Sequence, residues 1–154
     1  MRPRLPPPIV MLLAAGCMWA LHRWLPLAQL LASPWNRLAL IPGALAVTTM
    51  GAAFGAFRRA GTTVNPMDPA KATQLVTGGV FGLSRNPMYL GLTLLLVGWA
   101  VWLGSASPWI VPPLFAFVIT LVQIIPEERA LERLFGAQYA DYRSRVPRWI
   151  GRSR

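Results

Sequence analysis

The chain has 154 residues, of which 55% are hydrophobic and only 13% are charged, and its formal net charge is +10 at pH 7. This hydrophobic fraction excludes an ordinary soluble globule and indicates a protein of the lipid bilayer. The single cysteine, Cys17, excludes an internal disulfide framework and a multi-cysteine metal site. The basic residues do not predict nucleic-acid binding, because they flank apolar segments and form no single stripe.

Four apolar segments predict an all-α integral membrane protein with about four transmembrane helices. The expected spans cover residues 9–31, 38–57, 87–104 and 109–125. His22 and Arg23 interrupt the first segment, and Trp24 and Pro26 follow at once. We interpret this point as a helix end at the membrane interface, where an arginine extends its charge toward water.

Two polar segments lie outside these spans. Residues 58–86 predict a long, ordered loop, because turn-forming residues punctuate it and apolar residues are interspersed. Residues 127–146 predict an amphipathic C-terminal helix on the membrane surface or folded over the loop, with a solvated tail as the alternative. Its apolar stripe is Leu131, Leu134, Phe135, Tyr139, Tyr142 and Val146.

The basic residues predict the orientation of the chain. With four spans, only Arg23 and Arg37 fall on the side opposite the long loop. The positive-inside rule therefore places both termini, the loop 58–86 and the C-terminal helix in the cytosol, with the spans in the cytoplasmic membrane. The cytosolic set is Arg2, Arg4, Arg58, Arg59, Lys71, Arg85, Arg129, Arg133, Arg143, Arg145, Arg148, Arg152 and Arg154.

A candidate site lies at the cytosolic membrane boundary. The turn Arg85-Asn86-Pro87 begins one helix, and Pro126-Glu127-Glu128 follows the last span, so the two clusters can meet. Arg85 offers a planar fork for a carboxylate, and Tyr89 offers an aromatic face for a cation. The alternatives are that Arg85 is one more positive anchor and that the two glutamates favour a helix N-terminus.

These residues also carry a family resemblance. Residues 75–81, 84–91 and 127–131, with Phe135, Gly136, Tyr139, Tyr142 and Val146-Pro147, resemble the isoprenylcysteine carboxyl methyltransferase family, whose wider relatives are the phospholipid methyltransferases. The resemblance covers roughly residues 60–148 and implies one membrane methyltransferase domain over residues 1–154. It implies S-adenosylmethionine as the cofactor, a lipophilic or small methyl acceptor as the partner, and no metal.

The resemblance also assigns roles to residues. It gives Arg85 the catalytic role. It implies cofactor contacts at Asn65, Thr73, Gln74, Leu75, Val76, Phe81, Asn86, Pro87, Met88, Tyr89 and Glu127.

Two departures bear on mechanism and substrate. The family usually has histidine after the arginine, whereas this chain has Asn86, which cannot titrate. Four residues before the matched glutamate, the eukaryotic enzymes have an arginine linked to substrate, and here this position is Gln123. We assign Gln123 to substrate contact, and we leave the acceptor as a carboxylate, an amine or a thiol.

Two other classes of function remain as alternatives. A small four-helix transporter needs a carboxylate within the membrane, but every acidic residue lies outside the expected spans. A non-catalytic membrane scaffold does not explain why Arg85, Pro87, Tyr89 and Glu127 are all present. Cofactor binding separates the enzyme from both alternatives.

Overall fold

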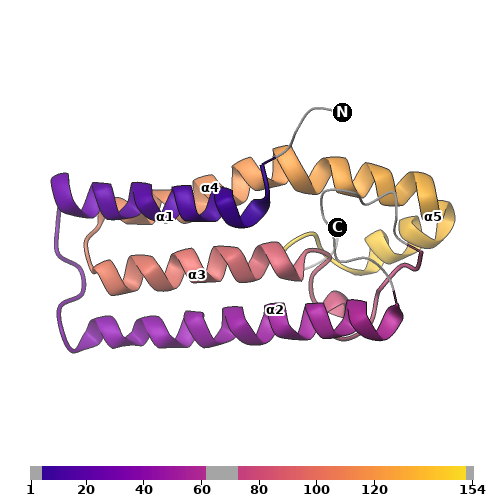
Figure 1. The fold of residues 1–154 in the computed structure, drawn as a ribbon, viewed down its shortest axis with the longest axis horizontal. Helices are drawn as coiled ribbons and strands as arrows, with labels where there is room; N and C mark the ends of the chain where they lie inside the picture. The colour runs from indigo at the N-terminus through magenta and orange to yellow at the C-terminus, as the bar shows by residue number, and fades with distance from the viewer. Residues whose placement is uncertain (1–4, 62–72, 152–154) are drawn as a thin grey trace. The chain divides into compact units, whose positions relative to one another are not determined.

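The computed structural model describes residues 5–61 and 73–151, which are helical apart from connecting segments. The chain divides into two compact units. Unit 1 comprises Met1–Val47 and Gly91–Ile119, and unit 2 comprises Thr48–Leu90 and Thr120–Arg154. Helices α2 (Leu40–Ala60) and α3 (Pro87–Leu103) contribute to both units (Figure 1).

Unit 1 begins with α1 (Pro7–Trp24), which is shorter than the predicted span 9–31. The last part of that prediction is wrong, because Pro26 cannot continue a helix and the chain after Trp24 is not helical. Ser105 instead pairs with this segment through an isolated bridge to Gln29. His22 at the end of α1 is also tied to Ser105, with 2.8 Å between Nδ1 and Oγ. The helix end expected at His22 and Arg23 is present as the end of α1 at Trp24.

Gly104 explains why α3 ends where it does. Its φ is +74°, which favours glycine. A Cβ at this position would lie 2.1 Å from the carbonyl oxygen of Leu31. The carbonyl oxygen of Gly104 accepts hydrogen bonds from the N–H groups of Leu30 and Leu31, at 2.7 and 3.0 Å. The glycine thus allows the segment after α1 to lie directly against the end of α3.

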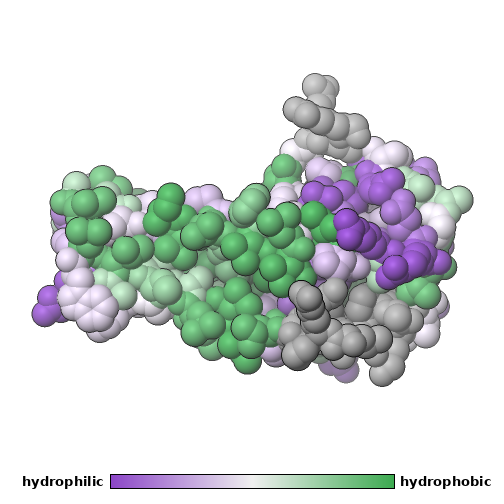
Figure 2. All heavy atoms as spheres, turned by 90° about the horizontal axis from the view of Figure 1, so that it is seen from above, coloured by the Kyte–Doolittle hydropathy of each residue, from purple (hydrophilic) through white to green (hydrophobic). Residues whose placement is uncertain are grey.

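The remaining helices of unit 1 are apolar and lie near their predicted positions. The short 3₁₀ helix η1 (Trp35–Ala39) precedes α2, and η4 (Ser107–Ile110) precedes α4 (Val111–Ile119). Trp99 on α3 donates to the carbonyl oxygen of Ala15 on α1 at 3.2 Å. Many apolar side chains of this unit are exposed, among them Leu12, Leu45 and Leu114. The surface of unit 1 accordingly shows extensive hydrophobic areas (Figure 2).

Two helical stretches among the described residues are long and apolar enough to cross a membrane. They are Trp35–Ala60, with 26 residues, and Ser107–Arg145, with 39 residues. The helix Pro87–Leu103 is apolar but shorter. The observed bounds therefore give an all-α protein with two candidate spans and one shorter apolar helix.

In unit 2, the predicted helix over residues 127–146 agrees least with the structure. The helix of the predicted fourth span continues past residue 125 into α5 (Ile125–Arg145), with a π-helical turn, η5 (Thr120–Ile124), between α4 and α5. Gly136 then interrupts α5 with φ 46° and ψ −119°, and the last turns of α5 run back toward its beginning (Figure 1). The prediction of one continuous amphipathic helix is therefore wrong. Of the expected apolar stripe, Leu134 is 45% exposed in the structure.

The reversal at Gly136 builds the apolar core of unit 2. Tyr139, Tyr142 and Val146 form a buried cluster, and Leu75, Leu131 and Phe135 pack against it. The Tyr142 hydroxyl donates to the carbonyl oxygen of Phe81 at 2.7 Å. Phe81 lies on the short 3₁₀ helix η3 (Gly79–Gly82). Of the two predicted locations for the C-terminal helix, the structure has the one folded over the loop.

Candidate active site

The turn before α3 provides the first part of the site. The Asn86 N–H donates to Ser84 Oγ at 3.1 Å, and the Asn86 carbonyl accepts from the Leu90 N–H at 3.0 Å. Pro87 follows at the first helical position and is fully buried. A proline is well placed there, because its missing N–H has no partner at a helix start. This geometry fixes Arg85 and Asn86 immediately before α3.

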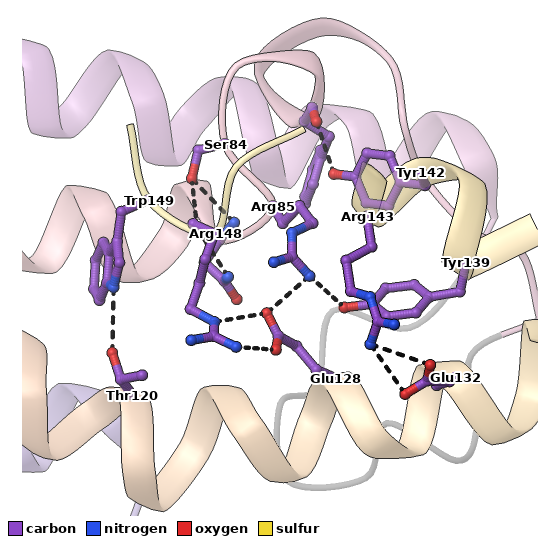
Figure 3. Close-up of polar contacts among 12 residues, drawn as sticks. Ser84, Arg85, Thr120, Glu128, Glu132, Tyr139, Tyr142, Arg143, Arg148 and Trp149 are labelled. Atoms are coloured by element: carbon purple, nitrogen blue, oxygen red, sulfur yellow. Dashed lines mark hydrogen bonds and ion pairs between the residues drawn. The ribbon is translucent and has the colours of Figure 1, made fainter. Parts of the chain in front are cut away.

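Arg85 belongs to a buried ion network. Its Nη1 lies 2.9 Å from Glu128 Oε1 and donates to the Tyr139 hydroxyl at 3.0 Å. Arg148 binds the same carboxylate at two points, with Nε 2.9 Å from Oε1 and Nη2 2.7 Å from Oε2 (Figure 3). The side chains of Arg85 and Glu128 are only 9% and 11% exposed. One carboxylate thus joins two guanidinium groups in a setting that screens charge weakly.

The surroundings affect the protonation of this network. Burial raises the pKa of the Tyr139 phenol, and the nearby Glu128 carboxylate raises it further. Burial likewise raises the pKa of the Tyr142 phenol. The hydrogen bonds that Arg148 donates to Glu128 raise the pKa of the Arg148 guanidinium. Both tyrosines therefore stay neutral at physiological pH, and Tyr139 accepts a hydrogen bond from Arg85 without adding a negative charge.

One donor of Arg85 has no acceptor in the part of the chain that the structure describes. Its Nε is buried and makes no hydrogen bond with any residue that the structure describes. A buried donor left unsatisfied costs about 1–3 kcal/mol. Such a group in a native structure requires an explanation, and a role in binding or catalysis is one.

A second pair links the beginnings of α3 and α5. The Tyr89 hydroxyl donates to Glu127 Oε1 at 2.5 Å. Tyr89 is buried, whereas Glu127 is only partly buried. Glu127 and Glu128 are adjacent, yet they have different partners: Glu128 binds the two arginines and Glu127 binds the phenol. The two glutamates therefore have different chemical environments.

The segment that follows α5, with Pro147, Arg148 and Trp149, completes the site. The Arg85 N–H donates to the Pro147 carbonyl at 2.9 Å, and Asn86 Nδ2 donates to the Arg148 carbonyl at 3.0 Å. Ser84 Oγ donates to that same carbonyl at 3.2 Å. Trp149 Nε1 donates to Thr120 Oγ1 on η5 at 3.2 Å. The segment thus contacts both the turn before α3 and the π-helical turn before α5.

The structure brings together only part of the predicted residue set. Arg85, Asn86, Tyr89 and Glu127 lie in the two linked groups described above, and Leu75 and Phe81 pack or bond against the Tyr139–Tyr142 cluster. Asn65 lies outside the described residues. Thr73 and Gln74 are exposed, Val76 and Met88 are half-buried, and Pro87 and Gln123 are buried, the last within η5.

Sequence reasoning missed one member of the network and assigned no specific role to another. Glu128 was placed in the cluster that can meet Arg85, but only Glu127 was given a role, and Arg148 was counted only as one of the cytosolic charges. The motif Pro147-Arg148-Trp149, directly after a helical pattern, was the available signal. It was insufficient, because the position of Arg148 depends on the reversal at Gly136.

These features define a helical protein with apolar spans and an arginine–carboxylate site at the helix ends, and comparison with known proteins gives the family. The model for the family described as phospholipid methyltransferase matches residues 35–138. The chain belongs to this family. The resemblance stated from the motifs is confirmed at this level, and family membership together with the two candidate spans indicates an integral membrane protein.

Two curated proteins are also similar. A protein of Haemophilus influenzae, described as uncharacterized, is 43% identical over 63 residues, which are 41% of this chain and 100% of that protein. Protein-S-isoprenylcysteine O-methyltransferase B of Arabidopsis thaliana is 35% identical over 74 residues, which are 48% of this chain. The match covers 38% of the plant protein's length. No solved structure matches the chain.

Proposed function

We propose that this protein is an S-adenosylmethionine-dependent membrane methyltransferase with a single functional domain over residues 1–154. Its acceptor is a lipophilic or small carboxylate, amine or thiol that arrives at the cytosolic face of the membrane. One observation carries the proposal: two polar contacts link the beginning of α3 to the beginning of α5. Arg85 pairs with Glu128, and Tyr89 pairs with Glu127, in a chain of the phospholipid methyltransferase family.

The residues present suit the proposed cofactor. A partly buried carboxylate such as Glu127 can accept hydrogen bonds from an amine or from ribose hydroxyls. The aromatic ring of Tyr89 can face a sulfonium cation. The remaining proposed contacts, which include Asn65, Thr73, Gln74, Val76 and Met88, rest on the resemblance. When bound, S-adenosylmethionine supplies an electrophilic methyl group, whose bond to sulfur breaks as the acceptor forms its new bond.

The protein's contribution to this reaction is mainly position and charge. We assign Arg85 the role of orienting an acidic acceptor or the transferring centre, because its fork is held on one side by Glu128 and Tyr139 and its Nε has no acceptor in the described chain. Asn86 donates its side-chain amide to a carbonyl and carries no titratable proton. An acceptor that is already an anion needs no general base, so it fits these residues best. Gln123 is the proposed substrate contact.

The proposed setting is the cytoplasmic membrane, crossed four times, with both termini in the cytosol. The distribution of basic residues supports this orientation. The acidic residues of the described chain, Glu127, Glu128, Glu132 and Asp141, all lie on α5 after Pro126, beyond the proposed fourth span at residues 109–125. A proton-coupled transporter needs such a group within the membrane, so the enzyme is the better proposal.

Cofactor binding by the detergent-purified, full-length protein tests the proposal. Titration calorimetry is expected to show saturable binding of S-adenosylmethionine and of its demethylated product, S-adenosylhomocysteine, with adenosine as a weaker comparison ligand. Membranes containing the overproduced protein are then incubated with S-[methyl-³H]adenosylmethionine, and tritium in lipid-extractable product is counted. Without binding and transfer, the chain is a transporter or a scaffold with this family's fold.

The chemical class of the acceptor is tested with a small panel. A prenylated cysteine, its carboxamide, a phospholipid with a primary amine and a long-chain thiol are offered to the purified protein. Methylation of the free acid but not of the carboxamide is the expected result. Methylation of the aminophospholipid alone would identify an amine as the acceptor. It would also contradict the role of Arg85 in orienting an acidic acceptor.

A further inference from the structure

The four residues after α5, Val146–Trp149, form a segment that we call the C-terminal strap. The backbone leaves the helix at Val146, with φ −117° and ψ 129°. The carbonyls of Pro147 and Arg148 then accept the Arg85 N–H, the Ser84 hydroxyl and the Asn86 amide. Three consecutive residues of the turn before α3 are thus bonded to two consecutive carbonyls of the strap.

The side chains of the strap make a second set of contacts. Arg148 binds both oxygens of Glu128, and Glu128 Oε1 in turn lies 2.9 Å from Arg85 Nη1 (Figure 3). Trp149 is bonded to Thr120 on η5. The strap therefore reaches Arg85 by two routes, one through its backbone carbonyls and one through the Glu128 carboxylate.

This arrangement restrains the orientation of one guanidinium group. The Arg85 backbone is held at its N–H by Pro147, and its Nη1 is held by Glu128 and Tyr139. Without Arg148, Glu128 would keep its contact with Arg85 through Oε1, but Oε2 would lose its contact with an arginine. The carboxylate could then rotate. The bidentate fork of Arg148 prevents that rotation, because two parallel hydrogen bonds fix the carboxylate plane.

We propose that Arg148 is a positioning residue for methyl transfer, which acts through Glu128 and the strap carbonyls to hold Arg85 and Asn86 in their working orientation. This inference rests on the proposed function. It extends the site beyond the family match, which ends at residue 138, because every residue of the strap lies further along the chain. Arg148 contacts neither cofactor nor acceptor in this scheme, and its effect on the rate passes through Arg85.

The substitution Arg148→Lys tests the proposal, because it keeps the charge and removes the bidentate geometry. The readout is the initial rate of tritium transfer from S-[methyl-³H]adenosylmethionine in membranes, per molecule of protein, at saturating cofactor. We expect a loss of about tenfold or more, since a displacement of about 1 Å at a reacting centre costs on the order of a hundredfold. The dissociation constant for S-adenosylhomocysteine should change less than about twofold.

A double-mutant cycle distinguishes positioning from a purely structural role. If Arg148 acts through Arg85, then Arg148→Lys should reduce the rate less than about twofold further in an Arg85→Lys background. Equal fractional losses in both backgrounds would overturn the proposal. The matched control is Arg143→Lys, because Arg143 pairs with Glu132 at an exposed position, where the side chains are 47% and 44% exposed. That control should leave the rate unchanged.

A second variant keeps the test decisive if Arg148→Lys lowers the melting temperature. Trp149→Phe retains the aromatic ring and removes only the hydrogen bond to Thr120. A few-fold loss of rate that disappears in the Arg85→Lys background would support the proposal that the C-terminal strap positions Arg85. An unchanged rate would overturn that proposal. Wild-type protein that binds no S-adenosylhomocysteine would refute the proposed function itself, whereas binding and transfer with an additive cycle would refute only the role of Arg148.

Discussion

Glu128 forms ion pairs with two arginines, Arg85 and Arg148, that are 63 positions apart in the sequence. It accepts hydrogen bonds from Arg148 with both carboxylate oxygens. The adjacent Glu127 instead accepts a hydrogen bond from Tyr89. Neighbouring carboxylates therefore have separate tasks in our proposal. Glu128 holds the site together, and Glu127 faces the cofactor.

The first prediction concerns Glu127. Glu127→Gln should weaken S-adenosylhomocysteine binding by about 1.5–3 kcal/mol, since it removes a charge-assisted contact. Calorimetry on the detergent-purified protein measures this change. Glu132→Gln is the control, because Glu132 pairs with Arg143 at an exposed position. Equal losses in the two variants would show that Glu127 has no special part in binding.

The second prediction concerns Glu128. Glu128→Gln should lower the free energy of unfolding by up to about 3 kcal/mol, because it leaves the buried Arg85 without its carboxylate. The Arg148 side chain is 38% exposed, so its pair with Glu128 contributes less than the more deeply buried pair with Arg85. Thermal unfolding in detergent measures the effect, with Asp141→Asn as the control for an exposed pair. A stable Glu128→Gln variant would mean that water or Tyr139 compensates Arg85.

The third prediction concerns Arg85. Arg85→Lys keeps the positive charge, and one ammonium group can still contact both Glu128 and Tyr139, which bind the same Nη1 of Arg85. The substitution removes the planar fork and the Nε donor, which our proposal assigns to the acceptor. We expect normal membrane insertion and a loss of methyl transfer on the order of a hundredfold. Arg58→Lys, at the end of α2, should be silent. Full activity of Arg85→Lys would reduce the residue to an anchor, and the catalytic assignment would pass to Asn86 or Tyr89.

The fourth prediction concerns Gly136. Gly136→Ala places a Cβ at a backbone conformation that L-residues rarely adopt, although the space around it is open. The cost should be about 1–3 kcal/mol of backbone strain, seen as a lower melting temperature and weaker S-adenosylhomocysteine binding. Gly51→Ala is the control, because Gly51 lies within α2 with open space around it and no positive φ. A neutral Gly136→Ala variant would show that the reversal in α5 does not need glycine.

The fifth prediction concerns topology. In a Cys17→Ser background, cysteines introduced at the exposed positions Thr77 and Ser144 should be shielded from an impermeant thiol reagent in intact cells. A cysteine introduced at the exposed Gln29 should be labelled, because the four-span proposal places residue 29 on the other side of the membrane. Labelling at Thr77 or Ser144 from outside would exclude that proposal.

The sequence predicted the helices better than it predicted their ends. Residues 87–104 were expected as a span, and α3 covers Pro87–Leu103, because proline at its start and glycine after its end are strong local signals. The first span was predicted too long, since hydropathy alone continues past Pro26. Hydropathy also gave no sign of the π-helical turn at Thr120–Ile124.

The site was predictable in part for a similar reason. The approach of the Arg85 turn to the two glutamates follows from the order of helices and turns, and the contacts Arg85–Glu128 and Tyr89–Glu127 are present. The roles assigned to these residues remain predictions. Arg148 was not predictable, because a periodic apolar pattern continues through Gly136 and gives no sign that the chain reverses there.

The π-helical turn Thr120–Ile124 also controls which way the following residues face. An α-helix rotates by about 100° per residue, so one residue more or fewer in this turn would rotate everything after it by about that angle. Glu127 and Glu128 would then exchange directions or face away from Arg85 and Tyr89. A single-codon insertion or deletion between α4 and α5 is therefore a simple route by which relatives could acquire a different pairing of carboxylates with the same helices.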